Sequence, residues 1–164
     1  NNFINADVDM IMFADDLGTQ EATILSPDMF NKFIEPAYQK LMQPCHDNNV
    51  LVGLHSDGNT LGILEAQVRA GVDMVNPQDL CKGIDNIAKV IKGKACINLD
   101  IDRQSIIPFG TAKDIDELIK EEVFKLGSKE GGLSFIAGIY PPTPPENVEA
   151  LCKSLLKYQR YWWE

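Results

Sequence analysis

Residues 51–59, LVGLHSDGN, join a short apolar run to a polar turn, and this junction indicates how the chain folds. The run from Val50 to Leu54 is typical of a buried strand, because it is short, continuous and aliphatic. His55 and Asp57 follow it two positions apart, so in an extended chain their side chains point to the same face. An imidazole and a carboxylate placed side by side can share a metal ion or a proton.

Similar apolar runs recur along the chain and alternate with longer segments of helical periodicity. The runs predicted to be strands are VDMIMFA (8–14), VLVGL (50–54), VDMVN (72–76), ACINLDI (95–101) and LSFIAGIY (133–140). Alternation of strands and helices predicts an α/β fold with a parallel sheet. Because the runs are almost wholly apolar, they predict a sheet that is covered on both faces.

The first long helix has a clear start and two prolines. Ser26 followed by Pro27 is typical of an N-cap with proline at the first helical position. The helix is expected to end near residue 49, and to kink or break at Pro36 and Pro44.

Threonines mark the predicted starts of two later helices. Thr111 is expected to cap a helix that stops at Gly127. Residues 143–146, Thr-Pro-Pro-Glu, have the pattern of a capping box with proline in the first turn. They predict the start of the last helix.

Five strand–helix units fit two architectures. One is a five-stranded doubly wound sheet, complete in itself. The other is part of a (β/α)8 barrel, which normally needs about 250 residues, whereas this chain has 164. Only about seven residues precede the first predicted strand, so we expect Asn1 to lie within a larger protein. Residues 1–164 are interpreted as one domain.

Composition excludes several classes of protein. The formal net charge of −9 argues against nucleic acid as a partner, and no apolar run has the length of a membrane span. The first residues lack the basic and apolar parts of a secretory signal, so the cytoplasm is the expected location. The four cysteines are scattered and form no C-x-x-C pair, which argues against a zinc knuckle and favours free thiols.

Polar side chains stand at the C-terminal end of every predicted strand, where both architectures bind their ligands. Turn residues are often polar for their own sake, but five such ends in succession favour a shared site. In this hypothesis the candidate catalytic residues are Asp15, Asp16, Asp100 and Tyr140; the candidate substrate-binding residues are Asn76, Gln78, Asn98 and Arg103; and the candidate metal ligands are His55 and Asp57.

Simpler interpretations exist for several of these residues. Asp15 and Asp16 could belong to a turn, although the next helix starts too late for either to cap it. Asn98 and Asp100 share a face, as does Asp102 if the strand continues, and all could be surface groups. Tyr140 could be a packing residue.

The ordered motifs of the whole chain resemble the uroporphyrinogen decarboxylase-like superfamily, which includes cobalamin-dependent methyltransferases. They are ADVDMIMFADDLGTQ, SPDMFNKFIEPAYQKL, LVGLHSDGN, AGVDMVNPQ, LDIDRQSIIPFGTAKDIDELIKEEV and YPPTPPENVEAL. The resemblance implies a (β/α)8 barrel with its site at the strand ends, of which this chain is the C-terminal part. It also places Asp15 or Asp16 near the catalytic aspartate of the decarboxylases.

This chain departs from the family pattern at two places. The zinc methyltransferases resemble H-x-C where this chain has His55-Ser56-Asp57, and they carry a further cysteine where residues 135–141 have none. The decarboxylases resemble GHG there, and residues 137–139 lack that histidine. A thiolate zinc site therefore does not carry over, although imidazole and carboxylate can bind zinc or a harder metal.

These observations favour a corrinoid-linked methyltransferase, with zinc and cobalamin as cofactors and a corrinoid protein as partner. One alternative is a tetrapyrrole decarboxylase, for which only Arg103 supplies a cation near a strand end. Another is a non-catalytic cobalamin-binding module with a D-x-H-x-x-G motif, in which Gly53 replaces the first residue. Because half a barrel leaves open strand edges, we expect the chain to self-associate or to bind a missing N-terminal half.

Overall fold

The protein is described by a computed structural model that covers residues 3–163, apart from the side chain of Asp79; Asn1 lies outside the described residues. Its strands form one parallel sheet in the order β1-β2-β3-β4-β5. They are β1 (Met10–Ala14), β2 (Leu51–His55), β3 (Met74–Asn76), β4 (Cys96–Asp100) and β5 (Leu133–Ile136). All five strands lie within the predicted runs or one residue beyond them.

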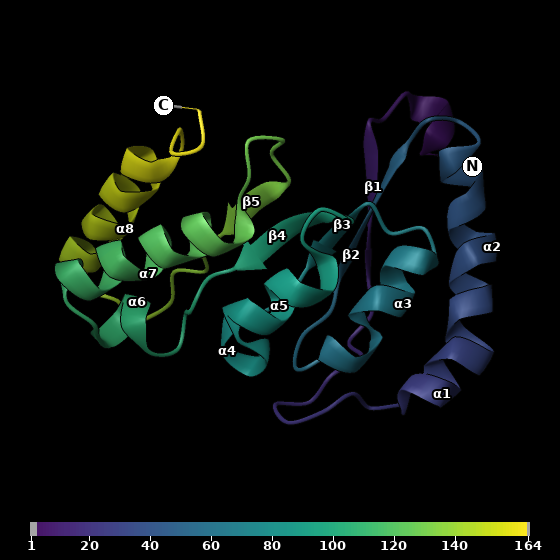
Figure 1. The fold of residues 1–164 in the computed structure, drawn as a ribbon, viewed down its shortest axis with the longest axis horizontal. Helices are drawn as coiled ribbons and strands as arrows, with labels where there is room; N and C mark the ends of the chain where they lie inside the picture. Colours follow the sequence, from purple (N-terminus) through teal and green to yellow (C-terminus); the bar gives the residue numbers. More distant parts are fainter. Residues whose placement is uncertain (1–2, 164) are drawn as a thin grey trace.

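Helices connect the strands and are arranged along the sheet from one end to the other (Figure 1). The longer ones are α2 (Glu35–His46), α5 (Ile84–Ile91), α7 (Ala112–Leu126) and α8 (Pro145–Tyr158). The short ones are η1 (Ile4–Ala6), α1 (Pro27–Met29), η2 (Phe30–Ile34), η3 (Leu61–Ile63), α3 (Leu64–Arg69), α4 (Asp79–Lys82) and α6 (Ile106–Phe109). No helix among the described residues combines the length and hydrophobicity that a membrane crossing requires.

The strand order identifies the architecture as part of a barrel. Each strand pairs with the next one along the chain, and the order never reverses. A doubly wound sheet needs such a reversal, so that alternative is wrong. Right-handed crossovers between successive neighbours place every connecting helix on the same side of the sheet, as in a (β/α)8 barrel.

The two faces of the sheet differ in burial. Leu54, Val75 and Leu99 point to the helices and are at most 2% exposed, because helices cover this face. On the opposite face, Met12 and Leu51 are 50% and 49% exposed. The expectation of a sheet covered on both faces was therefore wrong for the described residues, since consecutive crossovers leave one face for the barrel interior.

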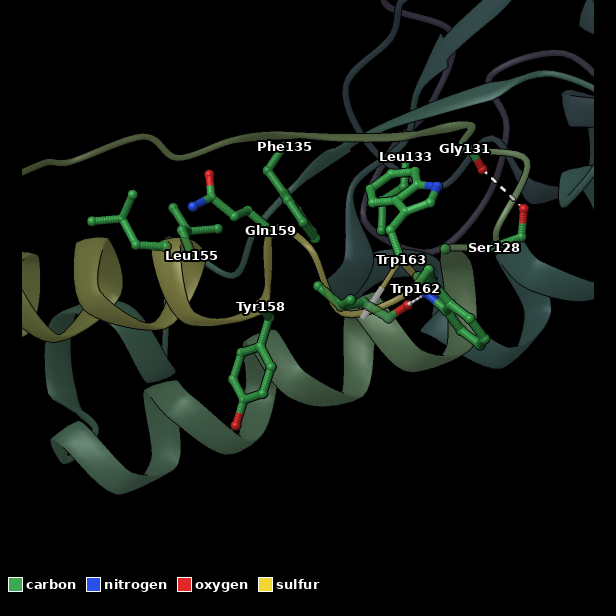
Figure 2. Close-up of a pocket in the computed structure, with 12 residues that line it drawn as sticks. Ser128, Gly131, Leu133, Phe135, Leu155, Tyr158, Gln159, Trp162 and Trp163 are labelled. Atoms are coloured by element: carbon green, nitrogen blue, oxygen red, sulfur yellow. Dashed lines mark hydrogen bonds between the residues drawn. The ribbon is translucent and has the colours of Figure 1, made fainter.

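A second core cluster forms where α7 and α8 pack beside β5. Figure 2 shows the apolar hollow of about 310 Å³ that Leu133, Leu155 and Trp162 help to line. Leu133 and Phe135 of β5 both line the hollow, so it lies along the helix-covered face of this strand. None of the candidate site residues lines it.

The structure confirms the N-cap at Ser26 and corrects the helix that follows. The Ser26 hydroxyl accepts a hydrogen bond from the backbone N–H of Met29. A π-helical segment, η2, then precedes α2, which ends at His46 rather than near residue 49. Pro36 lies in the first turn of α2, where a missing N–H is tolerated. Pro44 lies inside the last turns and does not end the helix.

The two threonine signals have different outcomes. Thr111 caps α7 in a capping box with Asp114, and α7 ends before Gly127, as predicted. Thr143 does not cap α8: the N-cap residue is Pro144, and Pro145 begins the helix. A proline at the N-cap has no side-chain acceptor, so the predicted capping box does not form.

Replacing Thr111 with alanine is expected to lower the free energy of unfolding by about 1 kcal/mol, because the hydroxyl that accepts from the backbone N–H of Asp114 is lost. Urea titration followed by circular dichroism measures this change. The control is Thr143→Ala, which should change the free energy of unfolding by less than about 0.5 kcal/mol. Equal effects of the two substitutions would contradict the assignment of the cap.

Candidate functional site

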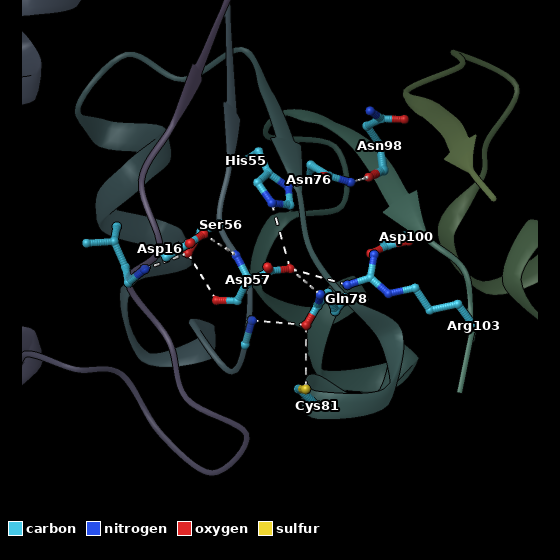
Figure 3. A network of polar contacts seen from close by, with 12 residues as sticks. Asp16, His55, Ser56, Asp57, Asn76, Gln78, Cys81, Asn98, Asp100 and Arg103 are labelled. Atoms are coloured by element: carbon cyan, nitrogen blue, oxygen red, sulfur yellow. Dashed lines mark hydrogen bonds and ion pairs between the residues drawn. The ribbon is translucent and has the colours of Figure 1, made fainter. Parts of the chain in front are cut away.

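The candidate site lies at the carboxyl ends of β2, β3 and β4 (Figure 3). His55 is the last residue of β2, and the strand register places it between Ala14 and Asn76 in one row across the sheet. Side chains of this row project from the face opposite the helices, because their direction alternates with that of Leu54. The row therefore places polar groups on the barrel-interior face.

Three potential metal ligands converge here. Asp16, His55 and Asp57 each offer one ligand atom, and these atoms lie within 4.8 Å of one another. Nε2 of His55 is 3.7 Å from Oδ1 of Asp57, as the two-residue spacing predicted. The His55 and Asp57 side chains are 33% and 50% exposed, so a solute can reach them. The backbone N–H of Asp57 also donates to Oδ1 of Asp16 at 3.4 Å, which joins the loops after β1 and β2.

Asp57 is held by an amide and by a guanidinium. The side-chain amide of Gln78 donates to Oδ1 of Asp57, while its own carbonyl oxygen accepts from the backbone N–H of Gly58 at 2.9 Å. Nη2 of Arg103 lies 3.4 Å from the same Asp57 oxygen. The carboxylate is therefore oriented from two sides before any ligand arrives.

Arg103 is itself anchored by a buried carboxylate. Its Nη1 donates to Oδ2 of Asp100 at 2.8 Å, and Asp100 is only 4% exposed. Burial raises the pKa of Asp100 above its usual range, and the Arg103 guanidinium opposes this rise. The guanidinium also lies 6.0 Å from the centre of the Tyr140 ring, within the range of a cation–π contact.

A chain of side-chain hydrogen bonds runs across the sheet from His55. Nδ1 of His55 faces Oδ1 of Asn76, and the Asn76 amide nitrogen donates to the backbone carbonyl of Asn98. The Asn98 side-chain oxygen accepts from the Ser134 hydroxyl at 2.9 Å. These contacts link β2 to β5 along the barrel-interior face.

Two glycines allow the loops after β1 and β2 to touch. Gly58 has a φ of 73°, and a Cβ atom there would lie 2.5 Å from the backbone carbonyl of Gly18. A Cβ on Gly18 would lie 2.7 Å from the backbone nitrogen of Asn59. Only glycine fits this contact, which brings Asp16 close to Asp57.

Two of the acids considered from the sequence face away from this group. Oδ2 of Asp15 accepts from the Tyr38 hydroxyl at 2.6 Å, so Asp15 ties β1 to α2. Burial and the Asp15 carboxylate raise the pKa of Tyr38. Asp102 accepts from the backbone N–H groups of residues 104–106, because β4 ends at Asp100 and the chain turns.

Three supporting groups were not among the candidate residues, although Ser56 belongs to the polar end of the second predicted strand. Ser56 accepts from the backbone N–H of Leu17 at 3.0 Å. Lys82 is 3% exposed and donates to the backbone carbonyl of Gly58. The thiol of Cys81 lies 3.7 Å from Oε1 of Gln78. Local sequence contains no signal for Lys82 or Cys81, because both reach the site from a four-residue helix, α4.

Comparisons with known proteins agree with the fold. The sequence matches the family model described as "Uroporphyrinogen decarboxylase (URO-D)" over residues 1–158. A methyltransferase from Methanosarcina mazei has 26% sequence identity and a TM-score of 0.68, over 97% of this chain and 45% of that chain. This chain thus spans less than half the length of that protein. No curated protein matches the sequence.

A second solved structure is much less similar. It is a phosphoribosylanthranilate isomerase from Thermotoga maritima with 10% identity and a TM-score of 0.26, over 92% of this chain and 88% of that chain. A score this low carries no structural argument.

Proposed function

The chain belongs to the uroporphyrinogen decarboxylase family, and from this premise we propose that it forms part of the active site of a corrinoid-linked methyltransferase. The observation that carries the proposal is the group of Asp16, His55 and Asp57 at the strand ends. The similarity to a methyltransferase supports the same reaction class. Since this chain spans 45% of that protein, the complete activity is proposed for a larger assembly.

The donor set suits a single divalent cation. An imidazole nitrogen and two carboxylates are competent ligands for zinc and for harder metals. In a tetrahedral zinc site with bonds of about 2.0–2.1 Å, any two ligand atoms lie about 3.3 Å apart. The 3.7 Å between Nε2 of His55 and Oδ1 of Asp57 is close to that separation. Small side-chain movements would bring the third ligand, Asp16, into range.

A bound cation would supply positive charge that lowers the pKa of a substrate thiol and holds its sulfur in place. Methyl transfer from a methylcorrinoid donor to such a thiol would break the bond between the methyl group and the donor, leave that electron pair on the donor, form a carbon–sulfur bond and release the thiol proton. In this proposal His55, Asp16 and Asp57 hold the cation. Gln78 and Arg103 keep Asp57 in position, while Asp100 and Tyr140 hold Arg103.

Tetrapyrrole decarboxylation is the weaker candidate. Its substrate carries several carboxylates, which require cationic partners. In the described part of the site the guanidinium of Arg103 already contacts Asp57 and Asp100, and Asp16 adds a third acid. A surplus of negative charge disfavours binding of a polycarboxylate.

Cobalt spectroscopy tests the proposal. Co²⁺ is added to the purified chain in place of Zn²⁺, followed by a small thiol. We expect a sulfur-to-cobalt charge-transfer band, because a thiolate completes the coordination of the metal. Asp57→Asn should weaken or abolish this band, since an amide is a poorer ligand than a carboxylate.

The matched control is Asp47→Asn, an exposed acid at the end of α2. Absence of metal binding in the folded wild-type chain would refute the metal site. Tight binding of a polycarboxylate porphyrin without metal would favour the decarboxylase instead.

A further inference from the structure

The chain has two histidines, and their hydrogen-bond partners require opposite positions of the ring proton. Nε2 of His46 lies 2.8 Å from the backbone carbonyl of Gly71. A carbonyl oxygen only accepts, so Nε2 of His46 carries the proton in the neutral ring. His55 differs, because its close partner lies on the Nδ1 side.

The partner of His55 is an amide whose own orientation is determined by the backbone. The side chain of Asn76 lies between the His55 ring and the backbone carbonyl of Asn98. Only the amide NH₂ group can satisfy that carbonyl, so Nδ2 of Asn76 faces Asn98 and Oδ1 faces His55. Rotating the amide by half a turn would oppose two acceptor oxygens.

The amide oxygen in turn determines which ring nitrogen of His55 is protonated. Oδ1 of Asn76 can only accept, so Nδ1 of His55 must donate. Protonation at Nε2 alone would place the Nδ1 lone pair against the Oδ1 lone pairs. Asn76 is 3% exposed, so solvent has little access to relieve that repulsion.

We propose that Asn76 is a positioning residue that keeps neutral His55 in the Nδ1–H form, with the Nε2 lone pair facing Asp57. The proposal assigns Asn76 this role in place of the substrate contact expected from its sequence. Both of its side-chain polar atoms are engaged within the sheet, which supports the new role. Oδ1 of Asp57 lies 3.7 Å from Nε2, beyond hydrogen-bond distance, so it competes weakly for a proton there and the Nε2 lone pair is free for a metal.

Two-dimensional ¹H–¹⁵N spectra of the histidine rings test the proposal directly. They are recorded at a pH at which the shifts show both imidazoles to be neutral. We expect His55 as the Nδ1–H form and His46 as the Nε2–H form in one spectrum. The spectrum of His46→Gln lacks the His46 signals, so the ring signals that remain belong to His55. An Nε2–H form for His55 in the wild-type chain would overturn the proposal.

Substitutions identify which group is responsible. Asn76→Ala should abolish the preference of His55 for the Nδ1–H form, because it removes the oxygen that accepts from Nδ1–H. Asn98→Ala is the matched control: it removes the contact with Ser134 but keeps the backbone carbonyl, so the His55 form should not change. An unchanged preference in Asn76→Ala would overturn the role of Asn76. If Asn76→Ala does not fold, the wild-type spectrum decides alone, since an Nε2–H form of His55 would overturn the proposal.

A second readout rests on the proposed function. In a metal-binding wild-type chain, Asn76→Ala should weaken Zn²⁺ binding about 10–100-fold, the usual effect of losing an outer-shell partner of a histidine ligand. Asn98→Ala should leave Zn²⁺ binding unchanged, and an equal loss in both variants would overturn the specific role of Asn76. Because the tautomer is read without metal, a chain with Nδ1–H His55 that binds no Zn²⁺ would refute the proposed function while supporting the present inference.

Discussion

His55→Ala is expected to weaken Zn²⁺ binding to this chain by at least about 100-fold, because it removes the one nitrogen ligand of the candidate site. The remaining carboxylates of Asp16 and Asp57 are partly exposed and bind Zn²⁺ weakly on their own. Isothermal titration of Zn²⁺ into the purified wild-type chain and variant measures the difference. Metal analysis of dialysed samples checks the stoichiometry, which should fall from one ion per chain to almost none.

The other histidine provides the control for this experiment. His46 lies at the end of α2, where its ring contacts the backbone carbonyl of Gly71 and lies 3.9 Å from Asp73, at the amino end of β3 and away from the candidate site. His46→Gln should therefore leave the Zn²⁺ affinity unchanged. Stoichiometric zinc in His55→Ala, or its loss in His46→Gln, would show that any metal binds elsewhere.

Much of the fold follows from local sequence. Each apolar run became a strand because its branched side chains fit a buried sheet, and Ser26 and Thr111 cap helices through their own hydroxyls. Strand order could not be predicted in this way, because the same alternation fits a doubly wound sheet and a barrel. Pairing of β1 with β2, instead of a reversal, is a tertiary property.

The candidate site was predictable where it depends on spacing within one strand. The two-residue separation of His55 and Asp57 placed their side chains together, as the structure shows. Local sequence could not separate Asp15 from Asp16, because their directions depend on Tyr38 and on the loop that carries Asp57. It likewise could not place the Arg103 guanidinium against Asp57, since these residues are 46 positions apart.

Arg103→Met is expected to lower the free energy of unfolding by about 3 kcal/mol at neutral pH. The substitution breaks an ion pair whose carboxylate, Asp100, is 4% exposed, and a buried charge that loses its partner is strongly destabilising. Oδ1 of Asp100 accepts no hydrogen bond from the described residues, so this oxygen has no donor that could replace the lost guanidinium. Urea titration of the wild-type chain and the variant measures this decrease in the free energy of unfolding. Lys94→Met, at an exposed pair with Glu65, should cost at most about 1 kcal/mol.

The free energy of unfolding lost in Arg103→Met should depend on pH in a defined direction. Burial already raises the pKa of Asp100 above 3.8, and removal of the guanidinium raises it further. Between 3.8 and the raised pKa, the folded variant binds more protons than the unfolded chain, so its stability falls as pH rises. Below 3.8 the carboxyl group is neutral in both states and this contribution vanishes. The difference from wild type should therefore be smallest in acid and reach its full size above the raised pKa of Asp100.

A double variant separates the buried charge from the loss of packing. In Arg103→Met with Asp100→Asn, no carboxylate remains to be buried without a partner, so part of the stability lost in Arg103→Met should return at neutral pH. The pH dependence of the loss should disappear as well, because the group that titrates is gone. A double variant that is no more stable than Arg103→Met would show that the guanidinium stabilises the fold through its contacts with Asp57 and Tyr140 instead.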